Sequence, residues 1–319
     1  MPWRESAAEL ERARAEQAVV ASAPRGDLVG IFTPPSPAVP ARGRCVVFFT
    51  RPRSHRNRMW IEGARRLASR GFAGFRFDYH GTGDSGGESG FLNPNQPYGD
   101  DAAAVLDHLR ARFGQRRFVL AGSCFDARTA LAAFATDAGS IDGIAFLAAP
   151  LMELDTLVKA HADHKDWRHL LRALSRAENW RALARPGRWR YMATVTSRVA
   201  RRAVAGPDTT LPLEPGFLRH FEALCRSRAR ALFLYGERDA EFRSFSIALE
   251  HLFPTLEPAV RERFTIEVWP GAVHDGFLEM ERQREVVERT LSWIEALPAA
   301  APSANGRASG AGEAAWTSP

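Results

Sequence analysis

The chain has 319 residues, of which 45% are hydrophobic and 25% are charged. This composition is typical of a globular protein with a large core, and it excludes a fibrous or intrinsically disordered chain. Arginine carries the net charge of +6, because Lys159 and Lys165 are the only lysines. No basic run is interleaved with aromatic residues as in a nucleic-acid-binding motif, so we expect no nucleic-acid partner.

The first sixteen residues mix arginine with glutamate and lack the apolar core of a secretion signal. No window approaches 18 uninterrupted apolar residues, so we expect a cytoplasmic protein that does not bind a membrane. The three cysteines, Cys45, Cys124 and Cys225, are widely spaced and odd in number. This spacing predicts neither a disulfide framework nor a metal site, and nothing in the sequence indicates the oligomeric state.

Apolar runs bounded by turn residues alternate along the chain with helical patterns. This alternation predicts an α/β fold with a mostly parallel central sheet and helices on both faces. In chain order, the predicted strands cover residues 28–32, 45–50, 73–78, 118–121, 143–147, 231–235 and 264–269. The predicted helices cover residues 58–69, 100–113, 124–135 and 280–297.

Three stretches depart from this alternation of strands and helices. Residues 1–25 are expected to form a charged N-terminal helix or a loose arm, and residues 299–319, rich in Ala, Ser, Gly and Pro, a disordered tail. Residues 151–225 contain no strand-like run and are predicted to form a helical cap. This cap, or lid, would be inserted into a core made of residues 26–150 and 226–298.

One strand leads directly into a sharp turn and a helix, with the sequence Phe-Val-Leu-Ala-Gly-Ser-Cys-Phe-Asp-Ala. It resembles the G-x-S-x-G nucleophile elbow, with Gly122 in first position, Cys124 in place of the nucleophile and Asp126 in place of the last glycine. Taking Ser123 as the nucleophile would put bulky Phe125 where the turn needs a small residue. The alternative is that Cys124 is a small buried hydrophobe in an elbow that has lost its chemistry.

The chain resembles the serine-aminopeptidase-like and thioesterase-like α/β hydrolases over roughly residues 27–297. Besides the elbow, the sequence Phe-Asp-Tyr-His-Gly-Thr-Gly-Asp-Ser-Gly resembles the D-x-R-G-x-G-x-S turn of that family. We interpret Asp78, His80 and Ser85 in this turn as structural residues. The resemblance implies an α/β-hydrolase fold with an inserted helical cap.

The resemblance also implies a catalytic acid and a histidine, in the chain order nucleophile, acid, histidine. Gly-Glu-Arg-Asp239 resembles the acid loop of the family, and Pro-Gly-Ala-Val-His274 resembles its histidine loop. Cys124, Asp239 and His274 are therefore the candidate catalytic triad, with Glu153 or Asp155 as the alternative acid. All would meet at the carboxyl ends of the strands, where α/β sheets build their sites.

The sequence contains opposing influences on the reactivity of the Cys124 thiol. A helix N-terminus and a neighbouring imidazole lower the pKa of a cysteine thiol and favour a thiolate–imidazolium pair. The carboxylate of Asp126 would favour the neutral thiol unless its side chain turns outward or pairs with Arg128. The sequence alone does not decide which effect is larger.

An oxyanion hole would take one donor from the backbone N–H of Phe125 and the other from the loop after the strand 45–50. Many relatives have His-Gly in that loop, whereas this chain has Thr50, Arg51 and then a proline, which has no N–H. We expect Arg51, through its backbone or its guanidinium, to be the substitute donor, with Arg53 and His55 behind it. Alternatively, these basic residues are only a solvated loop.

These features predict a hydrolase or acyltransferase that forms a cysteine acyl-enzyme from a thioester or activated ester, in specialised metabolism. The acyl group would pass to water, or to an alcohol or amine. Elimination, with His274 removing a proton, and a catalytically silent hydrolase-fold binding protein are the alternatives. No cofactor is expected.

The expected partner is a small-molecule acyl substrate, and residues 156–203 suggest how it is carried. They contain twelve Lys or Arg against three acidic residues, interspersed with four aromatic residues: Trp167, Trp180, Trp189 and Tyr191. Such a cap would suit coenzyme A or the phosphopantetheine of an acyl carrier protein. Alternatively, the tryptophans face the core and the arginines face water.

Overall fold

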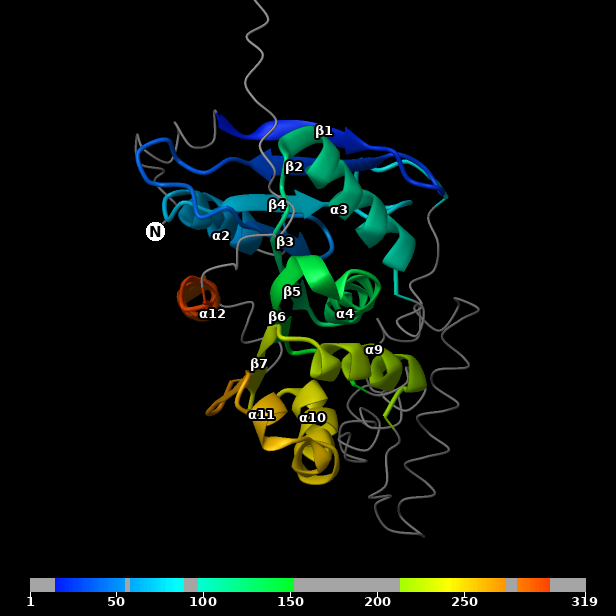
Figure 1. Cartoon of the computed structure of the whole chain (residues 1–319), viewed down its shortest axis with the longest axis vertical. Coiled ribbons are helices and arrows are strands. Elements are labelled where there is room, and N and C mark those ends of the chain that lie inside the picture. Colours follow the sequence, from blue (N-terminus) through cyan, green and yellow to red (C-terminus); the bar gives the residue numbers. More distant parts are fainter. Residues whose placement is uncertain (1–14, 55–57, 89–96, 152–212, 273–279, 299–319) are drawn as a thin grey trace, which may run out of the picture.

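The computed structural model describes residues 15–54, 58–88, 97–151, 213–272 and 280–298 (Figure 1). An eight-stranded sheet passes through them in the order β1-β2-β4-β3-β5-β6-β7-β8. Strands β3 to β8 are mutually parallel, whereas β2 pairs antiparallel with β4 and β1 pairs antiparallel with β2. The mostly parallel sheet predicted from the sequence is confirmed.

All seven predicted strands are present. The strands are β1 (Gln17–Ala21), β2 (Leu28–Thr33), β3 (Cys45–Phe49), β4 (Ala73–Phe77), β5 (Phe118–Ser123), β6 (Ile141–Leu147), β7 (Arg230–Gly236) and β8 (Phe264–Trp269). The α-helices are α2 (Met59–Ala68), α3 (Gly99–Phe113), α4 (Asp126–Thr136), α9 (Pro215–Arg226), α10 (Ala240–His251), α11 (Pro258–Arg261) and α12 (Met280–Glu295). Two short 3₁₀ helices are η2 (Ala138–Ser140) and η3 (Phe253–Thr255).

Strand β1 corrects the expectation for the N-terminal residues. We expected a helix or a loose arm over residues 1–25, but β1 pairs with β2 at the edge of the sheet, with Val19 opposite Gly30. Val19 and Ala21 are buried, whereas Val20 between them is 58% exposed. Five residues following a charged stretch are too few for this alternation to stand out in the sequence.

Helices cover both faces of the sheet. Helices α3, α4, α9 and α10 pack on one face, and α2 and α12 pack on the other (Figure 1). The side chains of β3 alternate between these layers, with Val47 and Phe49 on the first side and Val46 and Phe48 on the second. Because both faces are buried, the central strands are apolar throughout, which explains why they read as continuous apolar runs.

Helix α9 ends the stretch that we predicted to be the cap, and it packs on α4. The side chain of Glu214 caps its N-terminus by accepting hydrogen bonds from the backbone N–H groups of Gly216 and Phe217. Residues 152–212 of the predicted cap, and the predicted tail 299–319, lie outside the described residues. The cap and the tail therefore remain predictions.

The order of the strands reverses beside β3. From β3 the chain passes to β4 on one side, and it then returns through α3 to β5 on the other side. Open α/β sheets bind their ligands at such a reversal, beyond the carboxyl ends of the strands. Because Phe49 lies opposite Gly122 in the register of β3 and β5, the residues after Phe49 lie beside the turn that contains Cys124.

Candidate active site

Cys124 occupies the turn between β5 and α4. Its φ angle is 53°, in the left-handed region that few residues other than glycine adopt. Its N–H donates to the carbonyl of Leu147 at 2.8 Å, and its own carbonyl accepts from the N–H of Ala127 at 3.1 Å. These two bonds tie the strained residue to β6 and to the first turn of α4, which is the arrangement of a nucleophile elbow.

Gly122 allows strand β5 and helix α4 to approach each other closely. A Cβ atom at this position would lie 2.3 Å from the Cα of Ala127 and 2.8 Å from its nitrogen. The next residue, Ser123, is still paired with Leu147 of β6 in the sheet. The residue with the elbow conformation is therefore Cys124, in the register that the sequence predicted.

The other two cysteines differ from Cys124 in their surroundings. Burial raises the pKa of the Cys45 thiol far above its ordinary range, and burial also raises the pKa of Cys225 to about 11. Cys124 is partly exposed at the carboxyl end of β5. Since the thiolate is the nucleophilic form of cysteine, Cys45 and Cys225 are poorly suited to attack a substrate.

Asp239 follows β7 and begins helix α10. Its Oδ1 accepts a hydrogen bond from the N–H of Glu241 at 2.9 Å, and the residue is 4% exposed. The pKa of the nearby Tyr235 is raised well above its ordinary value by burial, by the charges of Asp239 and Glu241, and more weakly by Cys124. Asp239 and Cys124 therefore both influence the same buried tyrosine hydroxyl, which donates to the carbonyl of Ala149.

His274 lies outside the described residues, as do Glu153, Asp155 and His55, so their contacts remain predictions. The chain is described up to Ala272, whose carbonyl accepts from the N–H of Arg238 at 2.8 Å. The loop that leads to His274 is thus bonded to the loop that carries Asp239. The pairing of Asp239 with His274 itself remains a prediction.

The carboxylate of Asp126 points inward, and it adopts neither of the arrangements that we considered. Its Oδ1 lies 2.8 Å from an Nη atom of Arg51, whereas Arg128 pairs with Glu214. Burial raises the pKa of Asp126 to about 6, although Arg51 and the hydroxyl of Tyr79 both favour the charged form. At pH 7 most of this carboxylate is therefore ionised and faces Arg51.

The guanidinium of Arg51 packs against two aromatic rings. Its central carbon lies 5.5 Å from the ring centre of Tyr79 and 5.7 Å from that of Tyr98, and the two rings stack at 4.8 Å. Thr50 beside it is buried, and its Oγ1 has no partner among the described residues. Sequence analysis missed both tyrosines, and the only available signal was that Tyr79 follows the end of a predicted strand.

Two backbone N–H groups are candidates for the predicted oxyanion hole. Within the described ranges, the N–H groups of Arg51 and Phe125 donate no hydrogen bond. Pro52 has no N–H, and the N–H of Arg53 donates to Oδ1 of Asp78 at 2.8 Å. Arg51 and Phe125 are therefore the available donors at the ends of the neighbouring strands β3 and β5.

The glycine-rich turn after β4 has the structural role that we expected. The Ser85 hydroxyl donates to the carbonyl of Asp78 at 2.6 Å and accepts from the N–H of Val29 at 2.8 Å. The Nδ1 of His80 lies 2.8 Å from a carboxylate oxygen of Asp101, and both residues are buried. These contacts fix the turn to β2 and to α3.

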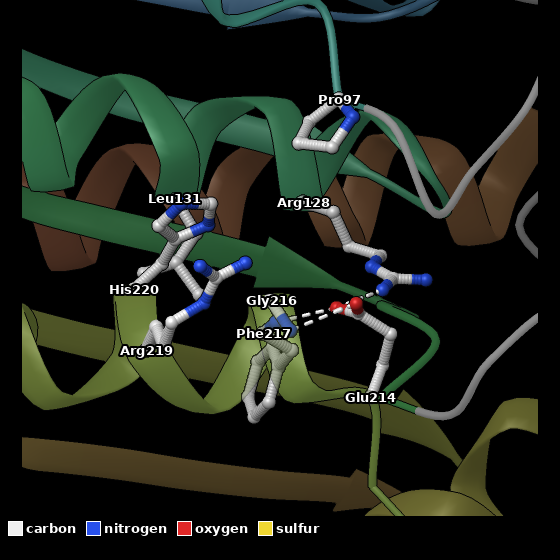
Figure 2. A pocket seen from close by; sticks show the side chains of 8 residues that line it. All are labelled: Pro97, Arg128, Leu131, Glu214, Gly216, Phe217, Arg219 and His220. Atoms are coloured by element: carbon white, nitrogen blue, oxygen red, sulfur yellow. Dashed lines mark hydrogen bonds and ion pairs between the residues drawn. The ribbon is translucent and has the colours of Figure 1, made fainter.

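A small pocket lies between helices α4 and α9 (Figure 2). Its lining residues are Pro97, Arg128, Leu131, Glu214, Gly216, Phe217, Arg219 and His220. Figure 2 shows the guanidinium of Arg128 pointing toward the carboxylate of Glu214, with which it forms an ion pair. The volume of about 80 Å³ is well below that of an ordinary small-molecule site, so we do not assign the acyl substrate to this pocket.

The described part of the chain contains no group of three or more His, Cys, Asp or Glu residues that could hold a metal ion. None of the helices in that part is long and apolar enough to cross a membrane.

Comparison with known proteins identifies the family. The family described as serine aminopeptidase, S33, matches residues 41–281. This match covers well over half of the sequence, so the chain belongs to this family of α/β hydrolases. A search of the curated proteins finds no match.

Solved structures share the fold at low sequence identity. An α/β serine hydrolase homologue from Coxiella burnetii is 15% identical with a TM-score of 0.54, over 87% of this chain and 97% of its own. The esterase Pf2001 from Pyrococcus furiosus is 15% identical with a TM-score of 0.55, over 88% of this chain and 90% of its own. A serine hydrolase without a lid from Xanthomonas campestris is 18% identical with a TM-score of 0.52, over 90% and 97%. The α/β-hydrolase fold predicted from the sequence is thereby confirmed.

Proposed function

We propose that this protein is an acyl-transferring or hydrolytic enzyme in which Cys124 forms a covalent acyl-enzyme. The observation that carries the proposal is the left-handed φ of 53° at a partly exposed cysteine in the turn between β5 and α4. Such strain persists only where the surrounding structure enforces it, and it clusters at catalytic residues. His274 would act as the base and Asp239 as the acid that orients it, in the order of the family.

In the first half of the reaction, His274 would accept the proton of the Cys124 thiol, and the sulfur attacks the carbonyl carbon of a thioester or activated ester. The oxyanion would be bound by the N–H groups of Phe125 and Arg51. When the tetrahedral intermediate collapses, the bond to the leaving thiol or alcohol breaks, and His274 donates a proton to that group. Water, an alcohol or an amine then attacks the acyl-enzyme, loses a proton to His274 and releases the Cys124 thiol.

Thioesters are the favoured substrate class because the acyl-enzyme is itself a thioester, so exchange with another thioester is nearly thermoneutral. The basic and aromatic composition of residues 156–203 would suit coenzyme A or a carrier-bound phosphopantetheine. Such substrates occur in the cytoplasm and in specialised metabolism, where reducing conditions would also keep Cys124 as a thiol.

The first test is intact-protein mass spectrometry after incubation with acyl-CoA, acyl-N-acetylcysteamine and aryl ester substrates. We expect an acyl adduct on the wild-type protein and on Cys225→Ala, and none on Cys124→Ala. Comparing water with amine-containing buffer then separates hydrolysis from acyl transfer. Turnover that persists in Cys124→Ala without any adduct would contradict covalent catalysis and favour the elimination reaction.

Alkylation by iodoacetamide tests the thiol independently of the substrate. We expect Cys124 to react at least about ten times faster than Cys225, whose pKa of about 11 keeps it protonated at pH 7. Equal and slow reaction of the two cysteines would contradict an activated thiolate. That result would favour the catalytically silent binding protein.

A further inference from the structure

Two positions at which this chain departs from the family pattern are in contact with each other. Asp126 stands where the nucleophile elbow has its last glycine, and Arg51 stands where many relatives have the glycine of His-Gly. The two side chains form an ion pair with a separation of 2.8 Å. Two positions at which the family pattern has glycine therefore carry opposite charges here. These charges pair between the ends of β3 and β5, where the strand order reverses.

The pair is largely shielded from water, and both of its side chains come from well-packed segments. The side chains of Arg51 and Asp126 are 19% and 9% exposed. Asp126 is the first residue of α4, and Arg51 is packed against the rings of Tyr79 and Tyr98. Ion pairs at the surface contribute little because water screens them and the side chains are mobile, but neither condition applies here.

The pair joins the two segments that would form the oxyanion hole. One half is the backbone N–H of Arg51, and the other is the N–H of Phe125, which directly precedes Asp126. One Nη atom of the Arg51 guanidinium pairs with Asp126, and the group packs against the two rings, whereas its Nε is buried and has no partner among the described residues. We take the backbone N–H as the donor for a substrate oxygen, because it lies on the strand end that neighbours the elbow. Pro52 has no N–H and the N–H of Arg53 is bonded to Asp78, so neither of the next two residues could take over this role.

Building on the proposed function, we propose that Asp126 is a positioning residue of the acyl-enzyme site. Its ion pair with Arg51 fixes the loop after β3 to the first turn of α4 and so sets the spacing between the two oxyanion donors. The loop after β3 would supply one of the two oxyanion donors, so a displacement of the Arg51 N–H would remove half of the oxyanion hole. The ion pair would prevent this displacement.

The test is a double-mutant cycle with Asp126→Asn, Arg51→Met and the double variant. The Arg51→Lys variant provides the conservative rescue. The matched control is Asp84→Asn, which removes an ion pair of Arg53 in the same loop, away from the elbow. For each variant we would measure the rate of Cys124 acylation by an aryl ester in a single turnover, the rate of alkylation by iodoacetamide, and the unfolding temperature.

We expect acylation to slow by about 10²-fold in each single variant, which is the typical effect of losing one oxyanion donor. Alkylation needs no oxyanion hole, so its rate should not fall. The double variant should be no slower than the worse single variant, because both remove the same contact. Arg51→Lys should be acylated faster than Arg51→Met. Asp84→Asn should be acylated at the wild-type rate.

Two results would overturn the proposal. One is acylation within about threefold of the wild type in both single variants. The other is a parallel loss of acylation, alkylation and unfolding temperature, which would show that the pair supports only the fold. If the wild-type protein forms no acyl-enzyme at all, the proposed function fails, and hydrogen–deuterium exchange of a peptide covering residues 45–54 decides the inference. Exchange must then accelerate in Asp126→Asn and Arg51→Met but not in Asp84→Asn.

Discussion

At the scale of single residues, Asp126 is a buried carboxylate. The favourable contacts with Arg51 and Tyr79 offset only part of the cost of burying its charge. The burial of this carboxyl group raises its pKa to about 6, compared with about 4 in an unfolded chain. Between these two values the folded state keeps a proton that the unfolded state has lost. The contribution of Asp126 to the free energy of unfolding therefore falls as the pH rises from about 4 to about 6.

We predict that Asp126→Asn changes this pH dependence. The difference in free energy of unfolding, wild type minus variant, should decrease by up to about 3 kcal/mol between pH 4 and pH 6 and stay constant above about pH 7. Urea unfolding at a series of pH values measures it. Asp84→Asn, which changes an exposed carboxylate of the same region, serves as the control.

Gly122 provides a second prediction at this scale. In Gly122→Ala, the added methyl group would lie 2.3 Å from the Cα of Ala127, so strand β5 and helix α4 must separate. We expect a loss of about 2 to 4 kcal/mol in the free energy of unfolding and a slower alkylation of Cys124. Gly139→Ala is the control, since no atom lies within 4 Å of its added methyl group. If Gly122→Ala and Gly139→Ala had the same free energy of unfolding and the same rate of Cys124 alkylation, the close approach of β5 and α4 at Gly122 would be contradicted.

At the scale of elements, the contact between α4 and α9 depends on Glu214. This residue caps α9 and pairs with Arg128 of α4, so one carboxylate joins both helices. Burial works against its ionised form, but the N–H of Gly216 and the charge of Arg128 outweigh it and lower the pKa of Glu214. Its stabilising effect is therefore present at neutral pH and is lost as the pH falls below about 4.5.

We predict that Glu214→Gln lowers the free energy of unfolding by about 2 to 4 kcal/mol at pH 7, because the substitution removes one charge of a buried pair. The loss should shrink as the pH falls below about 4.5. On the same helix, Glu222→Gln changes an exposed pair with Arg226 and should stay within about 0.5 kcal/mol of the wild type. Equal effects of the two substitutions would contradict the role of Glu214.

At the scale of the whole molecule, the parallel sheet could be predicted from the sequence because its strands are buried on both faces and read as apolar runs. The elbow could also be predicted, since strand, turn and helix follow each other directly around Cys124. The environment of Asp126 could not. Its partners Arg51 and Tyr79 reach it only because β3 lies beside β5 and β4 lies on the other side of β3. No local sequence pattern encodes this strand order.

The distance between the two ends of strand β5 has a consequence for the oxidation of Cys124. Cys124 follows the carboxyl end of β5, whereas Cys45 lies opposite Phe118 at the amino end of the same strand, about 20 Å away along the chain direction. Cys225 also lies toward the amino ends of the strands, since its carbonyl accepts from Arg263, the residue before β8. A disulfide needs Cα atoms within about 7 Å. A sulfenic acid formed at Cys124 would therefore find no resolving thiol in the described part of the molecule, and its recovery would depend on an external reductant.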